Sequence, residues 1–411
     1  MSTSLTGSQH ALLQHRSFVA YWCARSVNNA AYQMQAVAVG WQIYALTGSA
    51  FDLGLVGLVQ FFPVVVLGVL IGHMADRYDR RIVIGTCQVI KALAAAVFAF
   101  GTIGDFLTRD AMLAILFVSG TARAFETPTM HTLVPGIVPP ALLPRAIAAS
   151  ATASQTATIC GPAIGGLLYV FGAATVYFTC AAAFVLASVL ISLIVLQGPP
   201  PEKKPVTMQT LFAGFSYIRH NRVVLGAISL DLFAMLLGGV TALLPVYAKD
   251  VLVTEAWGLG LLRSAPAIGA LTVSAWLAHR QLEHRIGHVL FAAIAVFGVA
   301  TVVFAFSTSL VLSIAALAVY GAADAISVVI RHSLVQTRTP NEMLGRVMAV
   351  NFMFTGTSGT LGEFRAGAVA ALFGAFTSIL VGGLGAIAVG LLWMRLFPEI
   401  ARIDKIQSHQ E

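Results

Sequence analysis

Twelve apolar segments, each long enough to cross a lipid bilayer, constrain this chain more than any other feature of its sequence. A hydrocarbon core about 30 Å thick needs about 20 apolar residues in a helix. Backbone groups in lipid must be hydrogen-bonded within the protein, so we expect helices rather than open strands. The predicted spans are 16–46, 50–75, 80–103, 110–136, 141–171, 174–197, 223–249, 256–279, 286–306, 309–337, 342–372 and 375–397.

The composition agrees with an all-α integral membrane protein. Hydrophobic residues make up 58% of the 411 residues and charged residues only 10%, whereas soluble domains carry about 25% charged residues. The net charge of +7 comes from Lys and Arg residues that gather in alternate loops, which is the pattern of cytoplasmic loops. We therefore expect both termini in the cytoplasm, the lipid bilayer as the surroundings, and no nucleic-acid partner.

The chain also repeats itself. The segment HTLVPGIVPPALLPRAIA from His131 aligns with HSLVQTRTPNEMLGRVMA from His332, at an offset of 201 residues. Two halves in the same orientation form a parallel repeat, which places a substrate site near the bilayer midplane. We expect a six-helix bundle in residues 1–197, a cytoplasmic linker with a short amphipathic helix in 198–222, and a second six-helix bundle in 223–411.

The loop after the second segment carries a distinctive motif, GHMADRYDRRIVI, at residues 72–84. It resembles the loop motif Gly-x-x-x-Asp-Arg-x-Gly-Arg-Arg of the major facilitator superfamily. The resemblance implies a cytoplasmic latch, in which an acidic group faces the positive end of a helix in the other half. The expected latch residues are Gly72, Asp76, Arg77, Arg80 and Arg81, with Arg346 as the partner. The alternative is that the arginines only fix the topology.

A second motif, TICGPAIGG at residues 158–166, resembles the helix-5 motif of superfamily exporters that exchange substrate for protons. The matching residues are Gly161, Pro162, Gly165 and Gly166. Pro162 is expected to kink the helix, and the glycines let a neighbouring helix approach closely. A general small-residue packing face is the alternative.

The form ADRYDRR, with further stretches along the chain, resembles the branch that contains the enterobactin exporter and macrolide-efflux-like proteins. This resemblance implies the superfamily fold, two parallel pseudo-repeated bundles of six helices. It also implies proton-coupled export of a small amphipathic molecule, siderophore-like or drug-like, by alternating access. A monomer in a bacterial inner membrane is the implied setting.

Ionisable side chains inside the predicted spans are costly in lipid and are therefore functional candidates. By the repeat, Arg25 corresponds to Asp231 and Arg123 to Asp324. We expect Asp231, Asp324 or Glu126 to carry the proton, with Arg25 and Arg123 as partners, and Glu363 as a weaker candidate. Alternatively, Arg123 and Glu126 are three residues apart and can pair with each other.

Other cations and a polar face also lie in these spans. Arg331 lies near the inner surface and is expected to extend its guanidinium to the interface, and Lys91 does so less easily. Asn28, Gln35 and Gln42 repeat every seven residues on one face of the first segment. That face either binds a polar substrate or joins helices by hydrogen bonds.

No constellation of catalytic residues, metal ligands or cofactor-binding residues is expected. No Gly-rich phosphate loop ending in Lys-Ser/Thr is present in the sequence, so we expect no cofactor and no ATP-driven step. Two alternatives stay open. One is a carrier of the same superfamily with another substrate or direction, such as a lipid or a metal complex. The other is a membrane receptor or enzyme on a borrowed fold.

Overall fold

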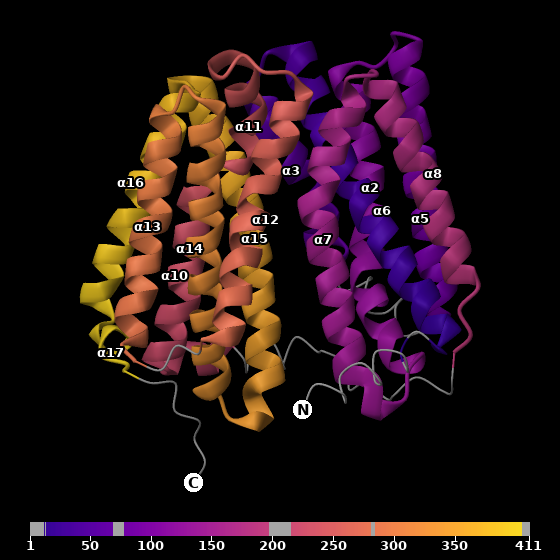
Figure 1. The fold of residues 1–411 in the computed structure, drawn as a ribbon. Helices are drawn as coiled ribbons and strands as arrows, with labels where there is room; N and C mark the ends of the chain where they lie inside the picture. The colour runs from indigo at the N-terminus through magenta and orange to yellow at the C-terminus, as the bar shows by residue number, and fades with distance from the viewer. Residues whose placement is uncertain (1–11, 13, 69–77, 197–214, 281–283, 405–411) are drawn as a thin grey trace. The chain divides into compact units, whose positions relative to one another are not determined.

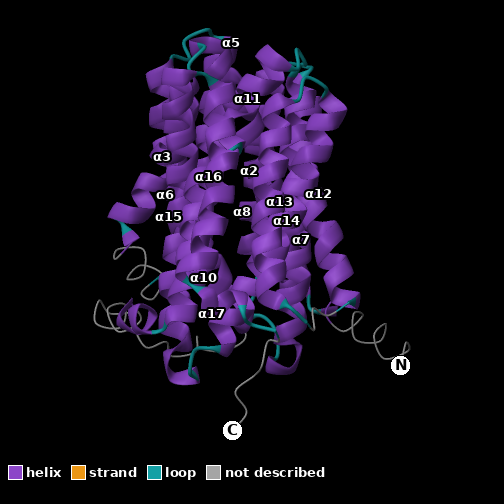
Figure 2. Ribbon diagram, turned by 90° about the vertical axis from the view of Figure 1, so that its left-hand side faces the viewer, coloured by secondary structure: helices purple, strands orange, loops and turns teal. Residues whose placement is uncertain are grey.

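The structure, a computed structural model, describes residues 12, 14–68, 78–196, 215–280 and 284–404. Within these ranges the secondary structure is helical and contains no strand (Figures 1 and 2). Seven of the described helices are long and apolar enough to cross a membrane.

Six long helices are described in the first half. Their bounds are α2 (Arg16–Thr47), α3 (Ala50–Val66), α5 (Arg80–Ile103), α6 (Arg109–Leu133), α7 (Leu143–Tyr169) and α8 (Ala173–Ser192). Asp79 caps the start of α5 because its side chain accepts a hydrogen bond from the Arg81 backbone N–H. Two short 3₁₀ turns, Val134–Gly136 and Pro140–Leu142, connect α6 to α7 where prolines exclude a regular helix.

The second half contains α10 (Arg222–Gly238), α12 (Ala256–His279), α13 (Ile286–Phe306), α14 (Leu310–Thr337), α15 (Asn341–Phe373), α16 (Ala375–Leu396) and the short α17 (Pro398–Ala401). The predicted spans 80–103, 256–279 and 286–306 coincide with α5, α12 and α13. Glycines at positive φ precede the last long helix of each half, Gly172 at 101° and Gly374 at 85°. The two halves therefore repeat this turn at an offset of 202 residues.

The predicted span 223–249 is not one continuous helix. The helix α10 ends at Gly238, and the chain continues through a 3₁₀ turn (Thr241–Leu243), a helical turn (Leu244–Val246) and a π-helical turn (Tyr247–Val251). Gly239 lies so close to α15 that a Cβ on it would stand 2.6 Å from the Gly362 carbonyl carbon. The break could not be predicted from hydropathy, because an apolar stretch has the same hydropathy whether it is a regular helix or an irregular segment.

The described residues divide into two compact units. Unit 1 contains Met1–Gly48, Leu58–Glu202 and Thr254–Ser264, and unit 2 contains Ser49–Gly57, Lys203–Val253 and Ala265–Glu411. The predicted bundle boundaries differ from these units in two stretches, since the start of α3 is in unit 2 and the start of α12 is in unit 1. Most of the predicted linker, 198–214, lies outside the described residues; residues 215–220 are helical.

Each unit has its own apolar core. In unit 1, α5 packs on α8, and α2 packs on α7 and α8. Fully buried side chains at this core include Tyr21, Ile84 and Ile191. In unit 2, α13 packs on α14 and α16, and α10 packs on α15 and α16. These packed helices hold the polar groups described next in fixed positions.

Candidate functional site

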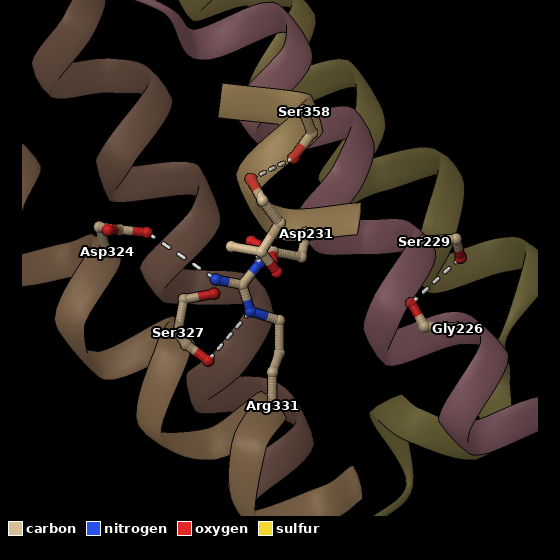
Figure 3. Close-up of polar contacts among 8 residues, drawn as sticks. Gly226, Ser229, Asp231, Asp324, Ser327, Arg331 and Ser358 are labelled. Carbon is tan, nitrogen blue, oxygen red and sulfur yellow. Dashed lines mark hydrogen bonds and ion pairs between the residues drawn. The ribbon is translucent and has the colours of Figure 1, made fainter. Parts of the chain in front are cut away.

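A buried guanidinium in unit 2 lies between two carboxylates (Figure 3). Arg331 of α14 donates a hydrogen bond to Asp231 of α10, and its Nη2 lies 3.8 Å from Oδ1 of Asp324. Its Nε also donates to the Ser327 carbonyl at 3.2 Å. The second carboxylate oxygen of Asp231 accepts a hydrogen bond from Thr355 Oγ1 of α15 at 2.7 Å. Among the described residues, Asp231 therefore has two partners and Asp324 has a single, longer contact.

The helical spacing explains this arrangement. Asp324 and Arg331 are seven residues apart on α14, so they share a face. The side chain of Asp231 is 10% exposed and that of Arg331 is 6% exposed, whereas that of Asp324 is 30% exposed. The expectation that Arg331 extends to the membrane interface is wrong, because its charge is buried against Asp231. The seven-residue spacing of Asp324 and Arg331 is the sequence feature from which their contact could have been predicted.

Unit 1 holds a second buried ion pair. Lys91 Nζ of α5 lies 2.5 Å from Oε2 of Glu126 on α6 and donates to Asn28 Oδ1 on α2, also at 2.5 Å. The ammonium group also lies 4.6 Å from the centre of the Phe184 ring. The side chains of Lys91 and Glu126 are 2% and 4% exposed. Glu126 is thus paired with Lys91, so the predicted alternative of an Arg123–Glu126 pair is not the arrangement in the structure.

The two arginines expected as partners of the proton carrier have other neighbours. Arg25 donates to the Tyr21 hydroxyl at 2.8 Å. Arg123 stacks over the Tyr32 ring, with its guanidinium carbon 3.5 Å from the ring centre. Across the described part of the chain, neither forms an ion pair with a carboxylate.

The polar face of the first segment is divided between several contacts. Gln42 donates to Thr102 Oγ1 at 3.0 Å and accepts from the Tyr177 hydroxyl at 2.7 Å, so both ends of its amide join helices of unit 1. Gln35 is 5% exposed, and Asn28 accepts from Lys91. These contacts favour the predicted alternative in which this face joins helices.

Two charged residues of α15, Arg365 and Glu363, contact other helices of unit 2, and Arg365 stabilises the end of α10. Arg365 donates to the Leu237 carbonyl at 2.6 Å, which is one of the carbonyls left without a helical partner where α10 ends. A cation at a helix C-terminus is also favoured by the helix dipole. Glu363 lies beside Gly57 of α3 within unit 2, since a Cβ on that glycine would stand 3.0 Å from Glu363 Oε2.

The helix-5 motif brings backbones into close contact in unit 1. A Cβ on Gly161 would stand 3.2 Å from the Ala30 carbonyl oxygen, and one on Gly165 would stand 2.7 Å from the Met34 Cα. On the other side of α7, a Cβ on Gly166 would stand 2.5 Å from the Ala256 carbonyl oxygen of α12. Pro162 lies inside α7, which continues on both sides of it.

The same contacts recur in unit 2, where the sequence does not repeat the full motif. Gly362 and Gly367 stand 201 residues after Gly161 and Gly166. A Cβ on Gly362 would stand 3.2 Å from the Leu236 carbonyl oxygen, and one on Gly367 would stand 2.7 Å from that of Ala50. The repeat therefore preserves close backbone packing at two glycines in each unit, although Glu363 takes the place of the proline.

The loop motif is only partly described. Gly72, Asp76 and Arg77 lie outside the described residues. Arg80 donates to the Thr132 carbonyl at 2.8 Å, and Arg81 pairs with Asp79 at 2.7 Å and donates to the Ile194 carbonyl. Arg346 is exposed near the start of α15. The latch stays a prediction.

Comparisons with known proteins agree on one family. A model of the family described as Major Facilitator Superfamily matches residues 21–363. The enterobactin exporter EntS of Citrobacter koseri is 30% identical over 414 residues, with 95% of this chain and 94% of that protein covered. The exporter of the same name from Escherichia coli O1:K1 / APEC is 28% identical over 410 residues, with the same coverage.

The fold is also similar to solved structures. The nucleoside transporter NupG superposes with a TM-score of 0.72, covering 93% of this chain and 99% of that chain. The identity is 14%, so this likeness concerns the fold alone.

Proposed function

The chain belongs to the major facilitator superfamily and is a multi-pass membrane transporter, and from this premise we propose that it exports a small amphipathic organic molecule in exchange for protons. The molecule is siderophore-like or drug-like, and transport proceeds by alternating access. The protein acts as a monomer in a bacterial inner membrane, with both termini in the cytoplasm. The similarity to enterobactin exporters along 95% of the chain supports export as the direction.

The contact of Arg331 with two carboxylates carries the proton-coupling part of the proposal. One guanidinium cannot fully neutralise both Asp231 and Asp324. Removing the charge of one carboxylate by protonation leaves an ion pair of Arg331 with the other, so the buried charge is balanced in that state. The site can therefore alternate between a protonated and a deprotonated form without leaving Arg331 unpaired.

Asp324 is the better proton carrier of the two. Its side chain is 30% exposed, compared with 10% for Asp231, so water reaches it more readily. Asp231 already accepts hydrogen bonds from Arg331 and Thr355 on its two carboxylate oxygens, whereas Asp324 has only its longer contact with Arg331 among the described residues. Glu126 ranks behind both because it is buried against Lys91.

Purified protein in liposomes that contain a pH-sensitive dye tests this proposal. Catechol siderophores, lipophilic cations and aromatic acids are added in turn, and proton movement is recorded with the flux of labelled substrate. We expect substrate-dependent proton movement that Asp324→Asn abolishes. Asp110→Asn, a matched change at an exposed carboxylate paired with Arg109, is expected to leave it unchanged.

Two outcomes contradict the proposal. Labelled substrate that crosses without proton movement refutes the coupling. Proton movement with an unchanged pH dependence in Asp324→Asn refutes the assignment of the carrier to that residue.

A further inference from the structure

The contact between α2, α5 and α6 in unit 1 carries more positive than negative charge. Three cations lie along it, namely Arg25, Lys91 and Arg123, against one carboxylate, Glu126. Lys91 Nζ forms an ion pair with Glu126 Oε2 at 2.5 Å. The two arginines are therefore left without a carboxylate partner anywhere in the described residues.

Helix contacts place the two arginines along one line. The Tyr21 hydroxyl of α2 lies 3.4 Å from the Met130 carbonyl oxygen of α6, and Tyr32 lies beside Arg123. The helices α2 and α6 are thus antiparallel neighbours over this stretch. Arg25 and Tyr32 are seven residues apart on α2, which is about 10 Å along one face.

Aromatic residues hold both guanidinium groups and leave most of their N–H groups available. Arg123 stacks face-on over Tyr32 at 3.5 Å, and the Tyr32 hydroxyl donates to Gln60 Oε1 at 3.2 Å. Arg25 donates once to the Tyr21 hydroxyl. A guanidinium has five N–H donors in a planar fork that matches a carboxylate. Both arginines are thus oriented by neutral neighbours and remain able to bind an anion.

The depth of Arg123 indicates what its surroundings must be. It lies ten residues, or about 15 Å, from the nearer end of α6, and it is exposed. An exposed charge at this depth does not face hydrocarbon; such residues face the bundle interior or a water-filled region. Arg123 therefore faces a region that water and a polar solute can enter.

We propose that Arg25 and Arg123 bind acidic groups of the transported molecule, so that the substrate class is an amphipathic organic anion with an aromatic part. This proposal rests on the transport function proposed above and narrows its substrate. It also gives the two arginines a role other than that of partners to the proton carrier. The half-buried Tyr32 beside Arg123 adds apolar surface that inorganic anions do not use.

Binding of three matched naphthalene compounds tests the proposal on the purified full-length protein. The compounds are 2,6-naphthalenedicarboxylate, 2-naphthoate and uncharged 2-naphthamide, and affinities are measured by titration calorimetry. We expect each added carboxylate to tighten binding about tenfold, as charged hydrogen bonds do. We expect Arg25→Gln and Arg123→Gln each to lose about tenfold for the dicarboxylate and to leave the affinity for the amide unchanged.

Matched controls separate charge from folding. Arg109→Gln removes an exposed guanidinium from the same helix, where Asp110 pairs with it, and it is expected to bind all three compounds like the wild type. Arg25→Lys keeps the charge and is expected to keep the preference for anions. An unchanged affinity for the amide shows that a variant is folded.

The proposal is overturned when the wild type binds the amide as tightly as the anions, when it binds none of the three, or when both glutamine variants keep the preference for anions. Failure of the proposed function looks different. Absence of proton movement in liposomes with preference for anions intact removes the coupling and leaves the anion site. Proton movement driven by neutral compounds alone removes the anion site and leaves the coupling.

Discussion

Substitution of Lys91 by methionine is expected to destabilise the protein strongly, because it leaves the Glu126 carboxylate buried without its cation. The two side chains are 2% and 4% exposed and lie 2.5 Å apart. The other carboxylate oxygen of Glu126 has no hydrogen-bond partner among the described residues. Removing one partner of a buried ion pair costs about 3–5 kcal/mol. We expect the same range for Glu126→Leu, which leaves the buried ammonium group with only the Asn28 side chain and the Phe184 ring and no anion.

The double variant, Lys91→Met with Glu126→Leu, is expected to recover most of the loss. It removes both charges and fills the site with apolar groups of similar volume, a change that is commonly neutral or stabilising. The half-buried Asn28 loses its donor, which costs about 1 kcal/mol. The double variant should therefore lie within about 2 kcal/mol of the wild type, with a coupling energy of several kcal/mol between the two sites.

Unfolding in mixed micelles, followed by tryptophan fluorescence during titration with sodium dodecyl sulfate, measures these free energies. The control is the exposed pair Arg109–Asp110, which lies on α6 like Glu126. Its removal should cost less than about 1 kcal/mol. The reasoning is refuted by single variants within about 1 kcal/mol of the wild type, or by a double variant that loses the sum of the two single losses.

Three further predictions concern local structure. Gly166→Ala, which places a Cβ 2.5 Å from a backbone oxygen, should lower the free energy of unfolding by about 1–3 kcal/mol in the micelle assay, whereas Gly345→Ala in open space should raise it slightly; equal effects would contradict the close packing. Arg365→Met should cost about 1–3 kcal/mol because it leaves a carbonyl unsatisfied where α10 ends, and a neutral result in the same assay would contradict this role. The hydrogen bond from Arg81 lowers the pKa of Asp79, so this carboxylate stabilises the fold above its unfolded pKa of about 3.9 and loses that contribution as the pH falls through the lower folded value. Asp79→Ala should thus cost about 1 kcal/mol at pH 7 and progressively less in acid, and a loss that stays constant as the pH is lowered would contradict the assignment.

Helix positions were predictable from the sequence where hydropathy alone decides them. The bounds of α5, α12 and α13 agree with the predicted spans because polar loops flank each apolar run. The break after Gly238 was not predictable in this way. It depends on the approach of α15 at Gly239 and on Arg365, which are distant in sequence.

The sequence indicated which ionisable residues lie within the spans, but it did not indicate their partners or the burial of Arg331. The repeat relates Arg25 to Asp231 and Arg123 to Asp324 as equivalent positions of two halves, and equivalence does not imply contact. Contacts follow from which helices are neighbours. Thus Lys91 of α5 pairs with Glu126 of the neighbouring helix α6. Spacing within one helix predicts which residues share a face, but it does not predict which other helix packs against that face.

Binding of an anionic substrate by Arg25 and Arg123, as proposed above, has a consequence for the energy source of transport. In the proposed exchange, export of a singly charged anion for one proton moves two elementary charges in the same electrical direction. With a negative cell interior, the membrane voltage then contributes about 4.6 kcal/mol per cycle for every 100 mV. This free energy corresponds to an accumulation ratio of more than a thousandfold, about the square of what the voltage alone supports for a neutral substrate. Transport should therefore respond more steeply to voltage than to the pH gradient.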